Sequence, residues 1–311
     1  MRRTASSFVA AALLTLASVA GTPASAQTET QAIGPVIDII GMWSGSQGTM
    51  EEQPLRGDPG VEVGEYVGMP INAAARQHAE SWDPTWASLP EWQGRPHPVT
   101  YSLRAPSGNF RLTAEYDPIY QNIIAYHFDG MFGRADRVIW MDGRPRPSKY
   151  AEHKYQGFSL GTWENGVLKV VTTHIKYAFI HRNGQPTSPY AVVTEYFYPH
   201  GDYMLGVLIV DDPIYLTEPL IRTTSYKRNP IQNVGRALPT EVVEEVATLK
   251  RGEVPAYPLG TEHHEYADIH HIPFEASLGG AETMYPEYIK KMQELMKMHA
   301  PAAVTSSTQQ R

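Results

Sequence analysis

A series of short apolar segments separated by turn residues constrains the fold of this chain more than any other feature of its sequence. The segments follow Phe110 and are rich in β-branched and aromatic residues, the composition typical of strands. They cover residues 119–128, 137–141, 157–163, 167–177, 190–198, 203–210 and 220–226. Asp-Gly, Asn-Gly and similar turn signals stand between them, at 129–130, 142–143, 164–166, 183–184 and 200–202. This pattern predicts an antiparallel meander, and seven or more strands favour a closed barrel or a sandwich because closure removes exposed edges.

Helical patterns are confined to the flanks of the strand region. Asn72 can cap a helix through Glu80, which must stop before Asp83-Pro84, and the Pro- and Trp-rich residues 83–108 predict an ordered loop. Thr240 can cap a second, short helix.

A C-terminal helix is predicted from Pro286, since proline favours the first helical position. Its apolar residues have the spacing of one buried face: Tyr288, Ile289, Met292, Leu295 and Met296. The expected fold is mainly β, an antiparallel barrel or sandwich with a few peripheral helices and this C-terminal helix.

The first residues have the three parts of a secretory signal in order. Met1-Arg2-Arg3 carries positive charge, residues 8–20 are almost wholly small or apolar, and Ala24-Ser25-Ala26 matches the cleavage pattern. A membrane anchor needs about 20 apolar residues, and this run is shorter. We therefore expect cleavage after Ala26, a periplasmic or secreted protein, and no stable membrane insertion.

The remainder is expected to form one β-rich domain over residues 27–298. This domain divides into a helix-and-loop part at 27–108, a strand meander at 109–228 and a helical and loop cover at 229–298. The polar residues 299–311 predict a disordered tail.

Composition excludes several classes of function. The chain has no cysteine, which removes thiol nucleophiles, iron–sulfur clusters and cysteine-ligated zinc. The formal net charge is −7 with both signs interspersed, so no basic face for nucleic acid is visible. Phosphate loops, dinucleotide fingerprints and a Gly-x-Ser-x-Gly motif are absent from the sequence, and no cofactor is expected.

Two motifs carry a Gly-x-Trp triplet, namely Gly41-Met42-Trp43 and Gly161-Thr162-Trp163. Each is expected at the start of a strand. This arrangement resembles lipocalin-like barrels, in which the tryptophan closes one end. The resemblance implies a barrel around a small-molecule site.

A second resemblance covers residues 69–288 and rests on four short motifs. They are Asp142-Gly143-Arg144-Pro145, Gly161-Thr162-Trp163-Glu164, Val193-Thr194-Glu195 and Asp211-Asp212-Pro213. The set resembles a widespread family of exported bacterial hypothetical proteins with the pattern D-G-R-P-H-P, G-x-W-E-G, V-T-E and D-D-P. It implies export and a β-barrel but no reaction. Arg146 stands where histidine is common in that pattern, so no role of that histidine is carried over.

Strand alternation selects candidates for acid–base chemistry. Three strand faces each place an ionisable group beside apolar neighbours: Leu168, Val170, Thr172 and His174; Ala191, Val193, Glu195 and Phe197; Ile123, Ala125, His127 and Asp129. If these faces point inward, then His127, His174 and Glu195 can converge as an acid–base set. The structural alternative is that each is a satisfied core or rim residue, and an opposite assignment of the faces turns them to solvent.

A ligand-binding set comes from aromatic residues in the strand region and from one arginine. The candidates are Trp43, Tyr126, Trp140, Arg144, Trp163 and Tyr196. Arg144 either holds the turn at Asp142 by pairing with a carboxylate such as Asp211 or Asp212, or clamps the carboxylate of a ligand.

Four histidines fall within residues 263–271, beside Glu262, Glu265 and Asp268. These residue types can bind zinc or copper, but the spacing matches no His-Glu-x-x-His or facial-triad pattern. We therefore assign no metal ligand.

Two functions remain open at this point. One is an exported protein that binds a small apolar or aromatic molecule in an aromatic-lined cavity. The other is a cofactor-independent lyase, hydratase or isomerase that uses His127, His174 and Glu195 on a similar substrate.

Overall fold

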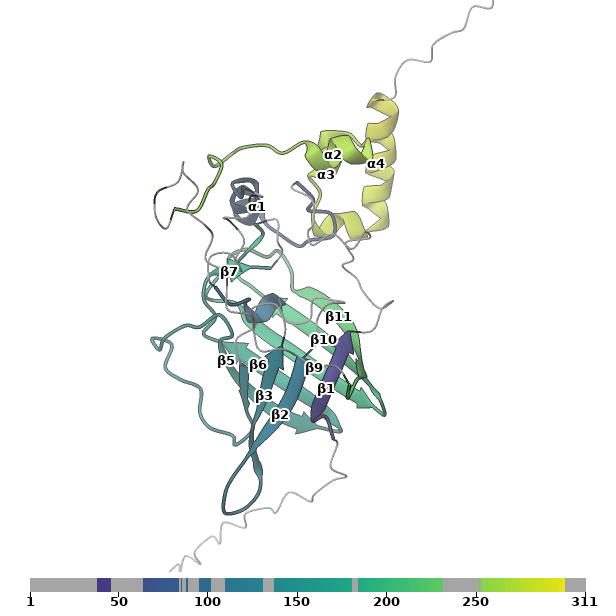
Figure 1. Ribbon diagram of the computed structural model, residues 1–311. Helices are drawn as coiled ribbons and strands as arrows, with labels where there is room; N and C mark the ends of the chain where they lie inside the picture. Colours follow the sequence, from purple (N-terminus) through teal and green to yellow (C-terminus); the bar gives the residue numbers. More distant parts are fainter. Residues whose placement is uncertain are drawn as a thin grey trace, which may run out of the picture. The chain divides into compact units, whose positions relative to one another are not determined.

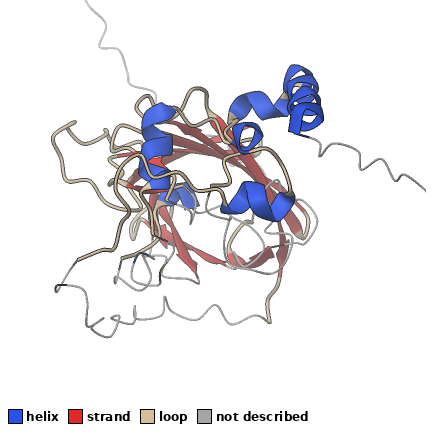
Figure 2. Ribbon diagram, turned by 90° about the horizontal axis from the view of Figure 1, so that it is seen from above, coloured by secondary structure: helices blue, strands red, loops and turns tan. Residues whose placement is uncertain are grey.

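The computed structural model describes residues 38–45, 64–83, 85, 88, 95–101, 110–130, 137–180, 184–231, 250 and 253–299. Nine strands of this part of the chain form a closed barrel (Figures 1 and 2). The prediction of a mainly β fold with a few helices, one of them C-terminal, is confirmed. The expected signal sequence, the helix expected from Thr240 and the expected disordered tail from residue 300 onward lie outside the described residues.

The barrel strands follow the chain with one interruption. They are β1 (Gly41–Gly45), β2 (Phe110–Tyr116), β3 (Ile123–Gly130), β4 (Arg137–Trp140), β5 (Phe158–Glu164), β6 (Val167–Thr173), β9 (Val192–His200), β10 (Tyr203–Asp211) and β11 (Leu220–Arg228). Around the ring their order is β1-β11-β10-β9-β6-β5-β4-β3-β2, and β2 pairs back onto β1. β7 (Ala178–Phe179) and β8 (Pro186–Thr187) form a separate two-stranded sheet. The strand β2 and this short pair are additional to the predicted segments.

One neighbouring pair in the ring, β4 and β5, runs parallel, with Ile139 opposite Ser159. Directions alternate around an antiparallel ring, so a ring of nine strands closes only with an odd number of parallel pairs. A parallel pair needs a long connection, which residues 141–157 supply. The predicted antiparallel meander therefore describes the other pairs of the ring but not this one.

Two of the predicted turns form hairpins, whereas Asp142-Gly143 lies in the long connection between the parallel strands β4 and β5. Asn165 and Gly166 connect β5 to β6 with φ values of 51° and 82°, the left-handed pair that a two-residue hairpin favours. Gly201 connects β9 to β10 with a φ of 58°. These turns fix the register of both hairpins.

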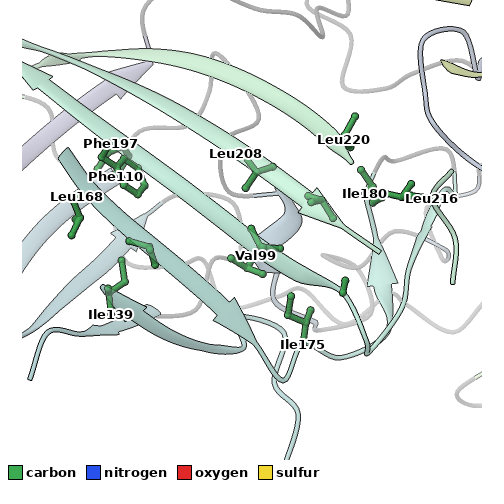
Figure 3. Packing of buried hydrophobic residues seen from close by; sticks show 14 of the residues in the cluster. Val99, Phe110, Ile139, Leu168, Ile175, Ile180, Phe197, Leu208, Leu216 and Leu220 are labelled. Atoms are coloured by element: carbon green, nitrogen blue, oxygen red, sulfur yellow. The ribbon is translucent and has the colours of Figure 1, made fainter. Parts of the chain in front are cut away.

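The hydrophobic core lies inside the barrel. Alternate residues of each strand point inward, and most are apolar. Figure 3 shows part of this core, in which Phe110, Leu168 and Phe197 lie close together although they come from three different strands. Phe110 stacks on Phe128 at 5.0 Å between ring centroids, and Phe128 lies 5.3 Å from Phe197.

The described helices are short except for the last. They are α1 (Ala73–Glu80), η2 (Val99–Tyr101), α2 (Glu265–His270), α3 (Phe274–Ser277), η3 (Ala281–Met284) and α4 (Pro286–His299). The predicted cap of α1 is confirmed, since the Asn72 side chain accepts a hydrogen bond from Ala75 N at 3.0 Å. None of these helices has the length and apolar character needed to cross a bilayer.

The predicted buried stripe of α4 is correct only in part, and its members Met292 and Leu295 are half-buried. Tyr288 is buried and donates a hydrogen bond to the Ala276 carbonyl oxygen at 2.8 Å. Ile289 and Met296, by contrast, are 55% and 46% exposed. The helix packs against α3 and η3, but these contacts leave Ile289 and Met296 exposed.

Candidate functional site

A buried ion pair lies inside the barrel wall. The guanidinium of Arg137, at the start of β4, donates from Nη1 to Oε1 of Glu195 on β9 at 2.9 Å, and from Nη2 to the other carboxylate oxygen. The two side chains are 4% and 0% exposed. Charges so deeply buried cost several kcal/mol each in lost hydration unless they are paired and hydrogen-bonded, and here they are.

Two small hydroxyl residues make room for this pair. β5 and β6 lie between β4 and β9 in the ring, and Arg137 crosses both to reach Glu195. Ser159 and Thr172 face each other on these strands. Arg137 donates to Ser159 Oγ at 3.2 Å and to Thr172 Oγ1 at 2.8 Å. Larger side chains at these positions would occupy the path of the guanidinium.

The guanidinium has five N–H donors, and four of them are used in these bonds. The second hydrogen on Nη1 has no acceptor among the residues that the structure describes. A carbonyl or hydroxyl oxygen placed beside the pair could accept a hydrogen bond from this fifth N–H donor.

In the register around the barrel, the pair lies between Phe128 on one side and Leu208 and Arg222 on the other. On one side, Phe128 is the register partner of Arg137 and belongs to the phenylalanine stack. On the other side, Leu208 lies between Glu195 and Arg222. Arg222 is buried and donates from Nη1 to the Thr100 carbonyl oxygen of η2 at 3.2 Å.

The predicted inward faces are correct on β9 and on most of β6. Leu168, Val170 and Thr172 are buried, and so is Glu195. His174 does not continue this face, because β6 ends at Thr173 and His174 has a φ of 57°. Its imidazole Nε2 lies 2.9 Å from the Ser148 carbonyl oxygen.

The predicted inward face of β3 is wrong. His127 lies opposite Thr113 and Val138 on the neighbouring strands. The inward-facing residue of β3 is instead Tyr126, which lies opposite the buried Ile139. The His127 side chain, 26% exposed, lies 3.1 Å from Glu115 Oε2 on the outside of the barrel. Alternation shows which residues share a face but not which face points inward, and on β3 both faces contain buried apolar residues. His127, His174 and Glu195 are therefore not brought together.

Three of the six candidate ligand-binding residues face the interior. Trp43 is 1% exposed; its indole N–H donates to the Ile39 carbonyl oxygen at 2.9 Å and Arg228 lies 4.7 Å from its ring. Tyr126 is buried, which raises the pKa of its hydroxyl despite a hydrogen bond with Trp163. Trp163 packs partly buried against the core, but its Gly-x-Trp triplet lies inside β5 and not at a strand start.

The other three candidates lie on the outside. Trp140 is on the outer face of β4, and Arg144 stacks on it with its guanidinium carbon 3.3 Å from the ring centroid. Arg144 pairs with Asp142 at 2.6 Å and not with Asp211 or Asp212, and this partner holds the pKa of Asp142 below its usual range. Tyr196 alternates with the buried Glu195 and lies near Tyr198.

The histidines of residues 263–271 do not face one another. His263 is buried, and its Nε2 lies 2.8 Å from the Glu80 carbonyl oxygen. His264 stacks on Phe274 at 3.7 Å, and His270 lies against Tyr266. The described residues include no group of three His, Asp or Glu side chains placed to hold a metal ion.

Sequence reasoning identified Glu195 but missed its partner. Arg137 begins a predicted strand, and arginine at a strand end is ordinarily expected to face solvent. Its alternation with the apolar Ile139 is the signal that was available, because an arginine and a glutamate on two inward faces form a natural pair. No family, curated protein or solved structure gives a significant match to this chain.

Proposed function

We propose that this protein is exported and binds a small apolar or aromatic molecule inside its barrel, with the Arg137–Glu195 pair as the polar anchor. The observation that carries the proposal is a fully buried ion pair in a barrel interior that is mostly apolar. Replacing such a pair by apolar residues of similar volume is often neutral or stabilising, so stability alone is a weak reason for its presence.

The surroundings of the pair have the composition of a ligand site. Small-molecule sites are mostly apolar and aromatic, with a few polar groups that orient the ligand. Here Phe128 and the phenylalanine stack provide the apolar surface. The remaining Nη1 hydrogen of Arg137 is a donor for a carbonyl or hydroxyl oxygen. Its orientation is held by Ser159 and Thr172, which limits the entropy lost on binding.

Binding is tested with three ligands that share one ring system. The purified protein is titrated with naphthalene, 2-naphthol and 2-acetonaphthone, with tryptophan fluorescence and thermal shift as readouts. We expect the hydroxyl and carbonyl compounds to bind at least about tenfold more tightly than naphthalene, since a hydrogen bond to a charged donor contributes about 1.5–3 kcal/mol. Equal affinities for all three, or no saturable binding, would contradict the proposal.

A variant pair locates the site. Thr172→Val removes one partner of Arg137 and keeps the side-chain shape, so we expect weaker binding of 2-acetonaphthone. Trp140→Phe changes an aromatic side chain on the outer face and should leave the affinity unchanged. Chromatography of the same mixtures detects any product, which separates binding from turnover.

Export is tested separately. The sequence pattern at Ala24-Ser25-Ala26 supports cleavage after Ala26. Expression in a Gram-negative bacterium followed by fractionation and N-terminal sequencing should give a periplasmic protein that begins at Gln27. A cytoplasmic protein with an intact N-terminus would refute this part.

A further inference from the structure

Four buried polar atoms without a hydrogen-bond partner among the described residues lie around α1, away from the Arg137–Glu195 pair. They are Tyr66 Oη, Arg76 Nη1, Gln185 Oε1 and Thr187 Oγ1. Tyr66 is 1% exposed, and Gln185 and Thr187 are fully buried. Native proteins contain few such atoms, so a group of four requires an explanation. We call these four residues the α1 polar cluster.

Contacts with one another and with neighbouring segments bring the four residues to the same part of the fold. The guanidinium carbon of Arg76 lies 4.5 Å from the centroid of the Tyr66 ring. Gln185 donates from Nε2 to the carbonyl oxygen of Glu65, the residue before Tyr66, at 3.2 Å. Thr187 is two residues further along, in β8, which packs against α1. The cluster therefore lies where α1, β8 and the segment before Met69 meet.

A buried carboxyl group borders the cluster. Glu80 is one turn after Arg76 on α1 and is 8% exposed. His263 fixes the end of this helix, with Nε2 2.8 Å from the Glu80 carbonyl oxygen. Tyr66, Arg76 and Glu80 interact electrostatically, which places the Tyr66 hydroxyl near both charged groups.

The hydrogen-bonding inventory of the cluster restricts its ligand. Gln185 Oε1 only accepts and Arg76 Nη1 only donates, while the hydroxyls of Tyr66 and Thr187 do both. An anion offers only acceptors, so it would leave Gln185 Oε1 unsatisfied and would face Glu80. A cation offers only donors and would face Arg76. Hydroxyl groups donate and accept at once, so several on one molecule can satisfy all four atoms.

We propose that the α1 polar cluster binds an uncharged molecule with neighbouring hydroxyl groups, a monosaccharide or a polyol. This site is independent of the barrel interior, because it uses α1, β8 and the segment around Tyr66, and none of the residues around Arg137. Its failure would leave the proposal for the barrel untouched.

The test measures binding of three defined probes, D-glucose, D-galactose and myo-inositol, to the purified protein. Saturation-transfer NMR and thermal shift at millimolar concentrations detect weak binding. We expect at least one probe to bind. Tyr66→Phe and Thr187→Val should each weaken that binding at least tenfold. The melting temperature of the unliganded variants should stay the same or rise, because the hydroxyls removed have no hydrogen-bond partner among the residues that the structure describes.

Tyr288→Phe is the matched control. Tyr288 is also buried, but its hydroxyl donates to the Ala276 carbonyl oxygen. This variant should lose thermal stability and retain the affinity for the probe. Failure of all three probes to bind, or binding that Tyr66→Phe and Thr187→Val leave unchanged, would overturn the proposal. A lower melting temperature of Tyr66→Phe without any probe binding would assign the cluster to ordered water and overturn it as well.

Discussion

Arg137 and Glu195 form an ion pair across two intervening strands of the barrel wall, with neither side chain more than 4% exposed. Glu195→Ala leaves the guanidinium buried without its counter-charge, so we expect a loss of about 3–5 kcal/mol in the free energy of unfolding. Urea denaturation monitored by tryptophan fluorescence measures it.

The double variant Arg137→Met/Glu195→Leu is the control for that prediction. It removes both charges and keeps apolar volume, so it should recover most of the lost stability. A double variant as unstable as Glu195→Ala would mean that the pair itself stabilises the fold, and this would remove the main argument for a ligand anchor.

His127 should contribute little to stability. It pairs with Glu115 on the outside of the barrel, where both side chains are partly exposed. Ion pairs of this kind contribute about 0–1 kcal/mol, so His127→Ala should change the free energy of unfolding by no more than that. Naphthol binding should also be unaffected. A large loss of binding would show that the outer face of β3 takes part in the site.

Gly157 and Gly201 form a matched pair for testing backbone strain. Both have a left-handed φ, 64° and 58°, which costs an alanine about 1–2 kcal/mol. A Cβ on Gly157 would lie 2.6 Å from the Thr173 carbonyl oxygen, whereas one on Gly201 would meet no atom within 4 Å. We therefore expect Gly157→Ala to destabilise the protein by about 3 kcal/mol or more, with overpacking added to strain, and Gly201→Ala by about 1 kcal/mol. Equal losses in urea denaturation would contradict the packing around Gly157.

The stability of the protein should depend on pH through Glu80. Burial raises the pKa of this carboxyl above its ordinary value of 4.5, although Arg76 acts in the opposite direction. The folded state then holds the proton more tightly than the unfolded state. The resulting stability is fully present below pH 4.5 and is lost as the pH rises through the folded pKa.

Glu80→Gln resembles the protonated form of the natural protein. The variant should therefore raise the free energy of unfolding, relative to the natural protein, by more at pH 8 than at pH 4. Urea midpoints at the two pH values measure the difference. An identical effect at both would mean that the carboxyl is not perturbed by burial.

The strands were predictable because local chemistry and tertiary structure agree on them. β5, β6, β9, β10 and β11 combine β-branched residues with turns that favour hairpins. Each begins and ends within two residues of its predicted bounds, except for the end of β6. The parallel pairing of β4 with β5 was not predictable in this way. It depends on how residues 141–157 return across the barrel, which no local pattern specifies.

The site was predictable only in part, for a related reason. Alternation located Glu195 because its face on β9 is uniformly buried. It failed on β3, where Ala125 and Tyr126 are adjacent and both buried, so the sequence does not distinguish the two faces. The α1 polar cluster joins segments far apart in the chain, and none of its members belongs to a motif. Only the fold shows that these residues lie in the same region around α1.

Strand β1 has a consequence for how the protein folds. Trp43 lies opposite Arg228, and Arg228 donates to the Ile40 carbonyl oxygen across a separation of 188 residues. The ring therefore cannot close until both strands are available, and contacts between such distant residues slow folding. Until then β2 and β11 each present an unpaired edge that another chain can occupy. Refolding from denaturant at high protein concentration should therefore give aggregation before the ring closes. A chaperone that shields strand edges would assist folding most at this step.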